Sequence, residues 1–252
     1  MPQLPIVVPP SFRIIAHRGA SGYAPENTLS SFLLAERMGA TEVELDVRFS
    51  KNKKLMICHD ESLDRFGHPG VKVCDRTAMA LAALDMGAWF SPYLYRGERM
   101  MRLDTLFCVF GERFTYHVEM KENAPALPEA LLRVILDHHL QERIIVTSKY
   151  FHLLEEMLRL NPDLRVGWLV AQLTPENVQH AAESGFFQIC PRTDGVDQER
   201  VSAANEILPE VRAHHVSSIA DALWAVESGC NGVTINWPDW LIHAEPVVGS
   251  LQ

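Results

Sequence analysis

The sequence predicts a (β/α)8 barrel, the fold class also called the TIM barrel, and three observations lead to this prediction. The chain has 252 residues, and single barrels of this class often run to about 250 residues. Short apolar runs rich in β-branched residues alternate with amphipathic helical windows, which is the order of βα units. Eight of these runs are spaced widely enough to be parallel strands. We therefore expect one barrel domain over residues 1–252.

The elements follow one another in a regular order. The expected strands lie at 13–17, 41–47, 116–120, 143–148, 164–170, 186–190, 210–216 and 232–236. Helical windows are expected at 28–39, 127–140, 150–160, 175–184, 198–206 and 218–228. Gly39 marks the end of the first helix, and the sequence of helix, glycine and buried strand recurs at Gly185 and Gly229. Thr174 and Ser218 are residues of the type that begins a helix.

A ninth apolar run, at 54–60, comes only a few residues after the second barrel strand. A parallel return needs a crossover of a dozen or more residues, so we expect this run to pair antiparallel as a hairpin arm. Residues 61–102 contain several prolines and glycines and no clear strand. We expect them to form an inserted cap segment, after the second strand, over one mouth of the barrel.

Composition narrows the class of protein. Hydrophobic residues make up 47% of the chain and charged residues 22%, which indicates a globular core and excludes a disordered or collagen-like chain. The net charge of -9 argues against nucleic acid as the main partner. Five cysteines without a CxxC pair indicate reduced thiols. We expect a cytoplasmic protein without a membrane span, and the sequence does not predict the oligomeric state.

Acidic side chains alternate with apolar ones in the second expected strand, at Glu42, Glu44 and Asp46. Side chains on a strand alternate between its faces, so these acids point into the barrel while the apolar residues pack outward. Glu119 and Lys121 share the inward face of the next barrel strand. Carboxylates crowded inside a barrel repel one another unless a cation joins them, although a structural salt-bridge cluster is the alternative.

Glu44, Asp46 and Glu119 form an all-oxygen ligand set. Such a set favours one hard divalent cation, Mg²⁺ or Ca²⁺, with Mn²⁺ as a further candidate. Lys121 either neutralises a substrate anion beside this cation or simply pairs with Glu119, and the strand pattern leaves both interpretations open.

Two histidines stand where apolar runs end. His17 ends the first strand and is followed by Arg18, and His59 ends the hairpin arm. Imidazoles titrate near neutral pH, so one can act as a base and the other as an acid. Arg18 has the forked geometry that binds phosphate oxygens. A divalent cation, two histidines and two cationic side chains together favour cleavage of a phosphodiester.

Several segments, in order and spacing, resemble the glycerophosphodiester phosphodiesterase family. They are HRGASGYAPENT (17–28), VELDV (43–47), HDESLDR (59–65), VEMK (118–121) and the cap-like LDMGAWFSPYLYRGERM (84–100). The resemblance implies a TIM barrel that hydrolyses small-molecule glycerophosphodiesters to glycerol 3-phosphate and an alcohol, through a cyclic phosphate, with a divalent cation. It also implies roles for seven residues: acid and base at His17 and His59, metal ligands at Glu44, Asp46 and Glu119, and phosphate contacts at Arg18 and Lys121.

Three positions depart from the family pattern. Lys149 stands where an aromatic residue is common, His214 where a tryptophan usually lines the pocket, and Asn236 where an aspartate is usual. These changes leave the expected metal and acid/base residues intact and alter the pocket wall. Lysophospholipase D activity, a phosphodiesterase that stops at the cyclic phosphate, and a non-catalytic barrel that binds a phosphorylated metabolite remain the alternatives.

Overall fold

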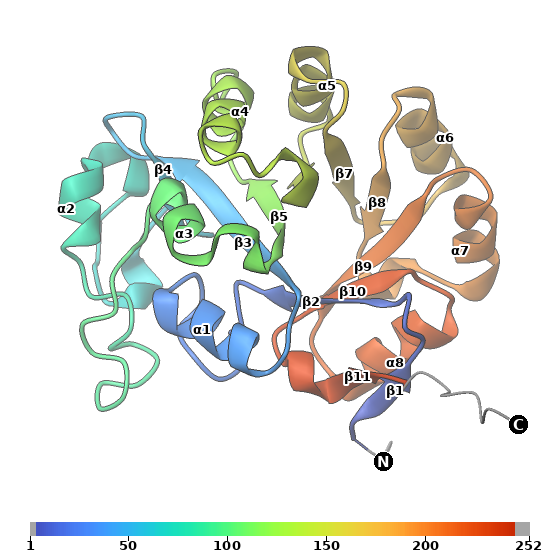
Figure 1. Ribbon diagram of the computed structural model, residues 1–252, viewed down its shortest axis with the longest axis horizontal. Helices are drawn as coiled ribbons and strands as arrows, with labels where there is room; N and C mark the ends of the chain where they lie inside the picture. The colour runs from blue at the N-terminus through green and yellow to red at the C-terminus, as the bar shows by residue number, and fades with distance from the viewer. Residues whose placement is uncertain (1–3, 245–252) are drawn as a thin grey trace, which may run out of the picture.

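A computed structural model describes residues 4–244 and shows a closed barrel of eight parallel strands (Figure 1). The sheet runs in the order β2-β10-β9-β8-β7-β6-β5-β3, and pairing of β2 with β3 closes it. The barrel strands are β2 (Arg13–His17), β3 (Glu42–Phe49), β5 (Thr115–Met120), β6 (Ile144–Ser148), β7 (Arg165–Val170), β8 (Gln188–Pro191), β9 (Glu210–Val216) and β10 (Gly232–Ile235). The predicted fold class is confirmed.

Helices cover the outside of the barrel (Figure 1). They are α1 (Leu29–Arg37), α3 (Leu103–Phe110), α4 (Leu127–Asp137), α5 (Phe151–Leu160), α6 (Pro175–Glu183), α7 (Gln198–Asn205) and α8 (Ile219–Glu227), with single turns η3 (Gly111–Arg113), η4 (Gln141–Arg143), η5 (Thr193–Gly195) and η6 (Pro238–Trp240). The side chains of Thr174 and Ser218 cap their helices as expected. Gly39, Gly185 and Gly229 adopt positive φ angles of 81°, 72° and 84°, which glycine reaches without strain.

Helix α3 is absent from the sequence prediction, which assigns no helix between the second and third barrel strands. Its N-cap residue, Arg102, makes no side-chain capping hydrogen bond, so the usual start signal is missing. Its eight residues, LDTLFCVF, are mostly apolar, and four of them are buried against the barrel. Tertiary packing, rather than a local signal, therefore stabilises this helix.

The alternation in β3 separates the packing face from the interior. Val43, Leu45 and Val47 are fully buried beneath the outer helices. Burial of each such side chain stabilises the fold by roughly 1.5–3 kcal/mol. Glu44 and Asp46 lie between them in sequence and therefore point into the barrel, as the pattern predicts.

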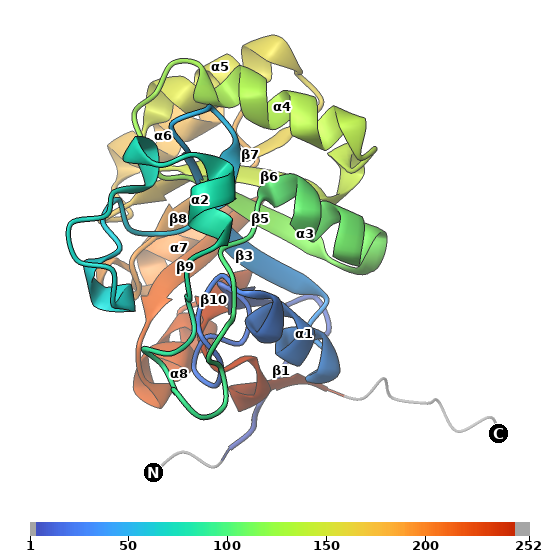
Figure 2. The ribbon, with the colours of Figure 1, turned by 90° about the vertical axis from the view of Figure 1, so that its left-hand side faces the viewer.

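The hairpin arm is β4 (Leu55–Ile57), and it pairs antiparallel with β3 as expected. Residues 61–102 follow, and they contain the short helices η1 (Asp64–Phe66), η2 (Val73–Asp75) and α2 (Ala78–Ala82) beside the β3–β4 hairpin (Figure 2). This segment is built on an apolar cluster separate from the barrel core. The cluster comprises Met56, Cys58, Leu63, Phe66, Val73, Ala78, Leu81, Met86 and Met100.

Two further strands join the ends of the described chain. β1 (Ile6–Val8) pairs in parallel with β11 (Leu241–His243), and the His243 Nε2 atom lies 2.8 Å from the carbonyl oxygen of Phe12. This small sheet is not predicted from the sequence, because each strand has only three residues. Within residues 4–244, no helix combines the length and the apolar composition that a bilayer crossing requires.

Candidate active site

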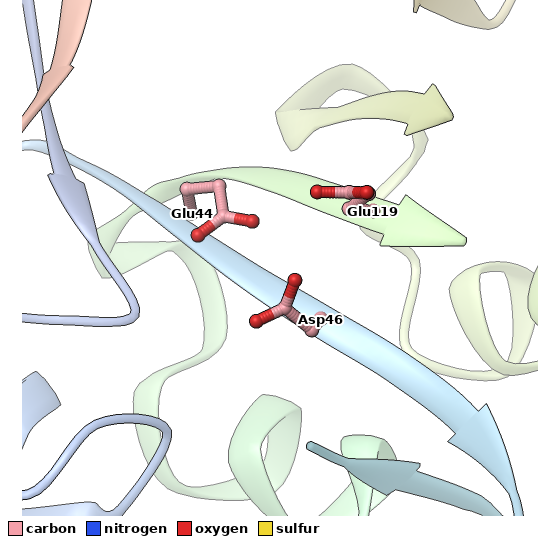
Figure 3. A group of neighbouring side chains, drawn as sticks. All are labelled: Glu44, Asp46 and Glu119. Carbon is pink, nitrogen blue, oxygen red and sulfur yellow. The ribbon is translucent and has the colours of Figure 1, made fainter. Parts of the chain in front are cut away.

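Three carboxylates converge where β3 and β5 approach the mouth of the barrel (Figure 3). Glu44 and Asp46 come from β3, and Glu119 lies directly beside Asp46 in the parallel register with β5. One oxygen from each carboxylate lies within 4.8 Å of the others. The structure therefore brings together all three residues that the sequence suggests as metal ligands.

Burial and mutual repulsion act on the charged forms of these carboxylates. Burial raises the pKa of Glu44 well above its usual range, and the neighbouring charges of Asp46 and Glu119 raise it further. Burial likewise raises the pKa of Glu119. The Oδ1 atom of Asp46 is buried without a hydrogen-bond partner, while its Oδ2 atom accepts a hydrogen bond of 2.9 Å from Asn27. A buried oxygen without a hydrogen bond, among clustered hard oxygen ligands, fits a divalent cation.

Two cationic side chains contact the same carboxylates. Nε of Arg18 lies 3.1 Å from Oδ2 of Asp46, and its Nη1 donates to Glu26 at 2.8 Å. Nζ of Lys121 lies 2.7 Å from Glu119 and 3.7 Å from Asp46. Although burial opposes it, Arg18 and then Lys121 hold the pKa of Asp46 well below its usual range. Lys121 thus pairs with Glu119, as one of the two sequence interpretations expects, and it also lines the cavity.

The two histidines reach the same site. Nδ1 of His17 donates to Oδ1 of Asn236 at 2.6 Å, which leaves the lone pair of Nε2 facing Glu44 at 3.7 Å. Burial, and next the charge of Arg18, lowers the pKa of His17 to about 3, so its imidazole is neutral at pH 7. Nδ1 of His59 lies 2.5 Å from the Asp60 carboxylate.

A cavity of about 330 Å³ opens at this end of the barrel. Six of the seven predicted site residues line it, namely His17, Arg18, Glu44, His59, Glu119 and Lys121. Asp46 is fully buried behind the lining, where it holds Arg18 and Lys121. The site can therefore receive a small anion among histidine, carboxylate and cationic side chains.

The family profile described as "Glycerophosphoryl diester phosphodiesterase family" matches residues 17–240. The chain belongs to this family. Among curated relatives, the glycerophosphodiester phosphodiesterase of Caldanaerobacter subterraneus is 28% identical over 234 residues, which are 91% of this chain and 96% of the relative. The Bacillus subtilis enzyme of the same name is 28% identical over 260 residues, which cover 94% of this chain and 87% of the relative.

Solved structures agree with the fold. The Oleispira antarctica phosphodiesterase, solved in complex with the product sn-glycerol-3-phosphate, superposes with a TM-score of 0.81 at 24% identity, covering 90% of this chain and 94% of that chain. The Agrobacterium tumefaciens glycerophosphodiester phosphodiesterase superposes with a TM-score of 0.76 at 24% identity, covering 91% of this chain and 98% of that chain. These likenesses support the barrel, and family membership with full-length relatives identifies this chain as an enzyme that hydrolyses glycerophosphodiesters.

Three residues of this phosphodiesterase hold predicted site residues in place, and the sequence does not predict these contacts. The sequence indicates Asn236 only as a departure in the pocket wall. In the structure, Oδ1 of Asn236 accepts a hydrogen bond from His17 and orients its ring. Glu26 accepts hydrogen bonds from Arg18 and Arg65, and Asn27 donates a hydrogen bond to Asp46. Glu26 and Asn27 belong to the HRGASGYAPENT segment, so their place in that motif was the available signal.

The other two departures do line the cavity, as expected. Lys149 and His214 are both part of its wall, together with Arg192 and His215. Burial, and next the charge of Arg212, lowers the pKa of His214 to about 3, so this imidazole is neutral at pH 7.

Proposed function

We propose that this enzyme hydrolyses glycerophosphodiesters to glycerol 3-phosphate and an alcohol with one divalent cation held by Glu44, Asp46 and Glu119. The proposal depends chiefly on one observation, which is that carboxylate oxygens from two strands lie within 4.8 Å of one another in a cavity that His17 and His59 line. The product bound to the Oleispira antarctica relative supports glycerol 3-phosphate as a ligand of the same kind of barrel. Oxygen ligands favour Mg²⁺ or Ca²⁺, with Mn²⁺ as a substitute.

His17 and His59 serve as the base and the acid. His17 is neutral with its Nε2 lone pair free, so it accepts the proton of the attacking hydroxyl. The carboxylate of Asp60 lies 2.5 Å from Nδ1 of His59 and orients its ring, and His59 donates a proton to the leaving alcohol oxygen. A divalent cation held by Glu44, Asp46 and Glu119 would supply Lewis-acid stabilisation of the developing negative charge.

The reaction proceeds in two displacements. The neighbouring glycerol hydroxyl forms a bond to phosphorus while the bond to the alcohol oxygen breaks, which leaves a cyclic phosphate. Water then opens the ring, with each histidine returning to its original protonation state. Arg18 and Lys121 orient the non-bridging phosphate oxygens, because both already lie at the cavity wall beside the carboxylates.

We also propose that residues 1–252 act as one barrel domain, with residues 61–102 as an inserted segment at its mouth. Arg65 in this segment contacts Glu26 and Asp60 at 2.5 Å and 2.6 Å, beside Arg18 and His59. The segment therefore supports the partners of two proposed site residues.

A substrate panel tests the reaction. Glycerophosphocholine, glycerophosphoethanolamine and a lysophospholipid are assayed after EDTA treatment and after addition of Mg²⁺, Ca²⁺ or Mn²⁺. We expect glycerol 3-phosphate from the first two substrates only when a metal is restored. Turnover by the metal-free enzyme would contradict the carboxylate assignment, and accumulation of a cyclic phosphate or cleavage of the lysophospholipid alone would favour an alternative activity.

Two variants test the histidines. His17→Ala and His59→Ala should each reduce kcat by about 10²-fold or more, because general acid and base groups typically contribute 10²- to 10⁴-fold. Circular dichroism and Mn²⁺ affinity should stay unchanged and show that the fold and the metal site survive. Normal turnover in either variant would remove that histidine from the mechanism.

A further inference from the structure

The mouth of the barrel divides into two arcs. Strands β10, β2, β3 and β5 are consecutive in the closed sheet, and the proposed catalytic and metal-binding residues lie on them or on the adjoining hairpin. Strands β6, β7, β8 and β9 form the opposite arc, and their ends contribute Lys149, Leu169, Arg192, His214 and His215 to the same cavity. A diester with its phosphate on the first arc would extend one of its two alcohols towards the second.

The second arc is rich in positive charge. Lys149 is exposed and forms no ion pair within the part of the chain that the structure describes, and its Nζ atom lies 5.1 Å from the centre of the Tyr150 ring. The guanidinium of Arg192 pairs with Asp194 through hydrogen bonds of 3.0 Å and 3.1 Å, and its side chain is 39% exposed. Apart from Asp194, no carboxylate forms an ion pair with either cation among residues 4–244.

Arg212 adds a buried charge to the floor of this cavity. It is only 2% exposed and lines the cavity. Its Nε donates to Gln188 at 3.1 Å, its Nη2 to the sulfur of Cys190 at 3.2 Å, and its Nη1 to Thr234. All of these partners are neutral, whereas buried charges are usually paired with an opposite charge. The positive potential of Arg212 therefore extends into the cavity, where an anionic ligand can compensate it.

We propose that the preferred substrate is a glycerophosphodiester whose alcohol carries a second anionic group, a phosphate, which binds Lys149 and Arg192 on the second arc. This inference rests on the proposed function, because it assigns the alcohol half of the same diester. Asp194 uses the Nε and one Nη2 hydrogen of Arg192, so the hydrogens on Nη1 and the second on Nη2 remain as a fork for phosphate oxygens. Lys149 and Arg212 add charge of the same sign. An alcohol that ends in an ammonium group, such as ethanolamine, meets like charge there and is disfavoured.

A matched substrate series tests this preference. Glycerophosphoglycerol is compared with its terminal phosphate monoester, with the analogue that ends in a carboxylate, and with glycerophosphoethanolamine, all at saturating metal. We expect kcat/KM for the phosphate monoester to exceed that for glycerophosphoglycerol by about tenfold or more at low salt, and the advantage to shrink as salt screens the charges. The carboxylate analogue should fall between these two, and the ethanolamine diester should be the poorest. Equal or better cleavage of the carboxylate analogue would overturn the assignment of phosphate.

A double variant locates the preference. Lys149→Gln with Arg192→Gln should reduce kcat/KM for the phosphate monoester by about tenfold or more and should raise it for glycerophosphoethanolamine, because the repulsive charges are gone. The matched control is Lys53→Gln with Arg159→Gln. Lys53 lies 4.9 Å from the Phe49 ring and Arg159 pairs with a nearby carboxylate at 2.7 Å, so similar contacts are lost away from the cavity. The control should keep the wild-type order of substrates.

The substrate series distinguishes a missing alcohol preference from a missing phosphodiesterase activity. If the enzyme cleaves all four diesters equally well in a metal-dependent reaction, or if the double variant keeps the wild-type order, the inference about the alcohol is wrong and the proposed function stands. If no diester is cleaved under any metal condition, the proposed function fails and this inference fails with it.

Discussion

The hydrogen bond between His17 and Asn236 offers the sharpest test of the proposed base. Oδ1 of Asn236 can only accept, so it holds the proton on Nδ1 of His17 at 2.6 Å and keeps Nε2 free to accept a proton. Ser21 donates to the same oxygen at 3.0 Å and fixes its position. Asn236→Leu preserves the approximate size of the side chain and removes the acceptor from both partners.

The expected loss follows from the value of one hydrogen bond. A net contribution of about 0.5–1.5 kcal/mol corresponds to roughly a 2- to 13-fold change in the ratio of the His17 tautomer with its proton on Nδ1 to the tautomer with its proton on Nε2. We therefore expect kcat to fall by between about twofold and tenfold in Asn236→Leu, less than the loss of about 10²-fold in His17→Ala. Asn236→Asp retains an acceptor oxygen and should stay within about threefold of the wild type.

Steady-state kinetics and nitrogen NMR of the histidine side chains give independent measurements. The NMR shifts of His17 should show a proton on Nδ1 in the wild type and in Asn236→Asp, and a mixture of tautomers in Asn236→Leu. A general loss of packing would change thermal stability without changing the tautomer. Wild-type kcat together with an unchanged tautomer in Asn236→Leu would refute the orienting role of Asn236.

Three further outcomes are expected. Glu119→Gln removes one of the clustered carboxylates and should weaken Mn²⁺ binding, measured by calorimetry, by about 10- to 100-fold, and unchanged affinity would exclude Glu119 as a ligand. Gly22→Ala would place its Cβ 2.2 Å from Nε1 of Trp237, so urea unfolding should show a loss of about 1–3 kcal/mol rather than wild-type stability. Acid should reduce stability through two groups at the base of the barrel. Burial lowers the pKa of His117 from 6.5 to about 4, so its contribution is complete above pH 6.5 and is lost as the pH falls towards 4. Although burial opposes it, hydrogen bonds from His117 and Arg13 lower the pKa of Glu42 to about 2, so its contribution is lost below pH 4.5. Urea unfolding from pH 7 to about pH 2 should show both losses of unfolding free energy. An unchanged loss between pH 6.5 and pH 4 in His117→Asn would contradict its assignment to His117.

The sequence predicts the barrel and the acidic cluster because both depend on local periodicity. Alternation of acidic and apolar residues in β3 determines which side chains face inward, and parallel register then places Glu119 beside Asp46. Gly39 and its two counterparts mark helix ends through a backbone angle that glycine adopts easily. Such signals are contained in a few neighbouring residues and need no knowledge of the rest of the chain.

Other features depend on contacts between distant residues. Asn236 is 219 positions from His17, and only closure of the barrel brings the two side chains together. The helix α3 has no capping signal and is stabilised by burial of its apolar residues. The positive charge of the second arc, formed by β6, β7, β8 and β9, depends on the same closure, because Lys149, Arg192 and Arg212 come from three different strands or strand ends.

Residues 61–102 form an apolar cluster with Met56 and Cys58 of the hairpin arm, separate from the barrel core, and this has a consequence for how such enzymes diversify. Because those side chains pack mainly on one another, the segment can change in length or composition across evolution while the barrel strands keep their own packing. Grafting a segment from a relative between β4 and α3 should therefore yield a folded chimera. Because Arg65 of this segment contacts Glu26 and Asp60, a donor segment that keeps an arginine at this place should retain the recipient's chemistry.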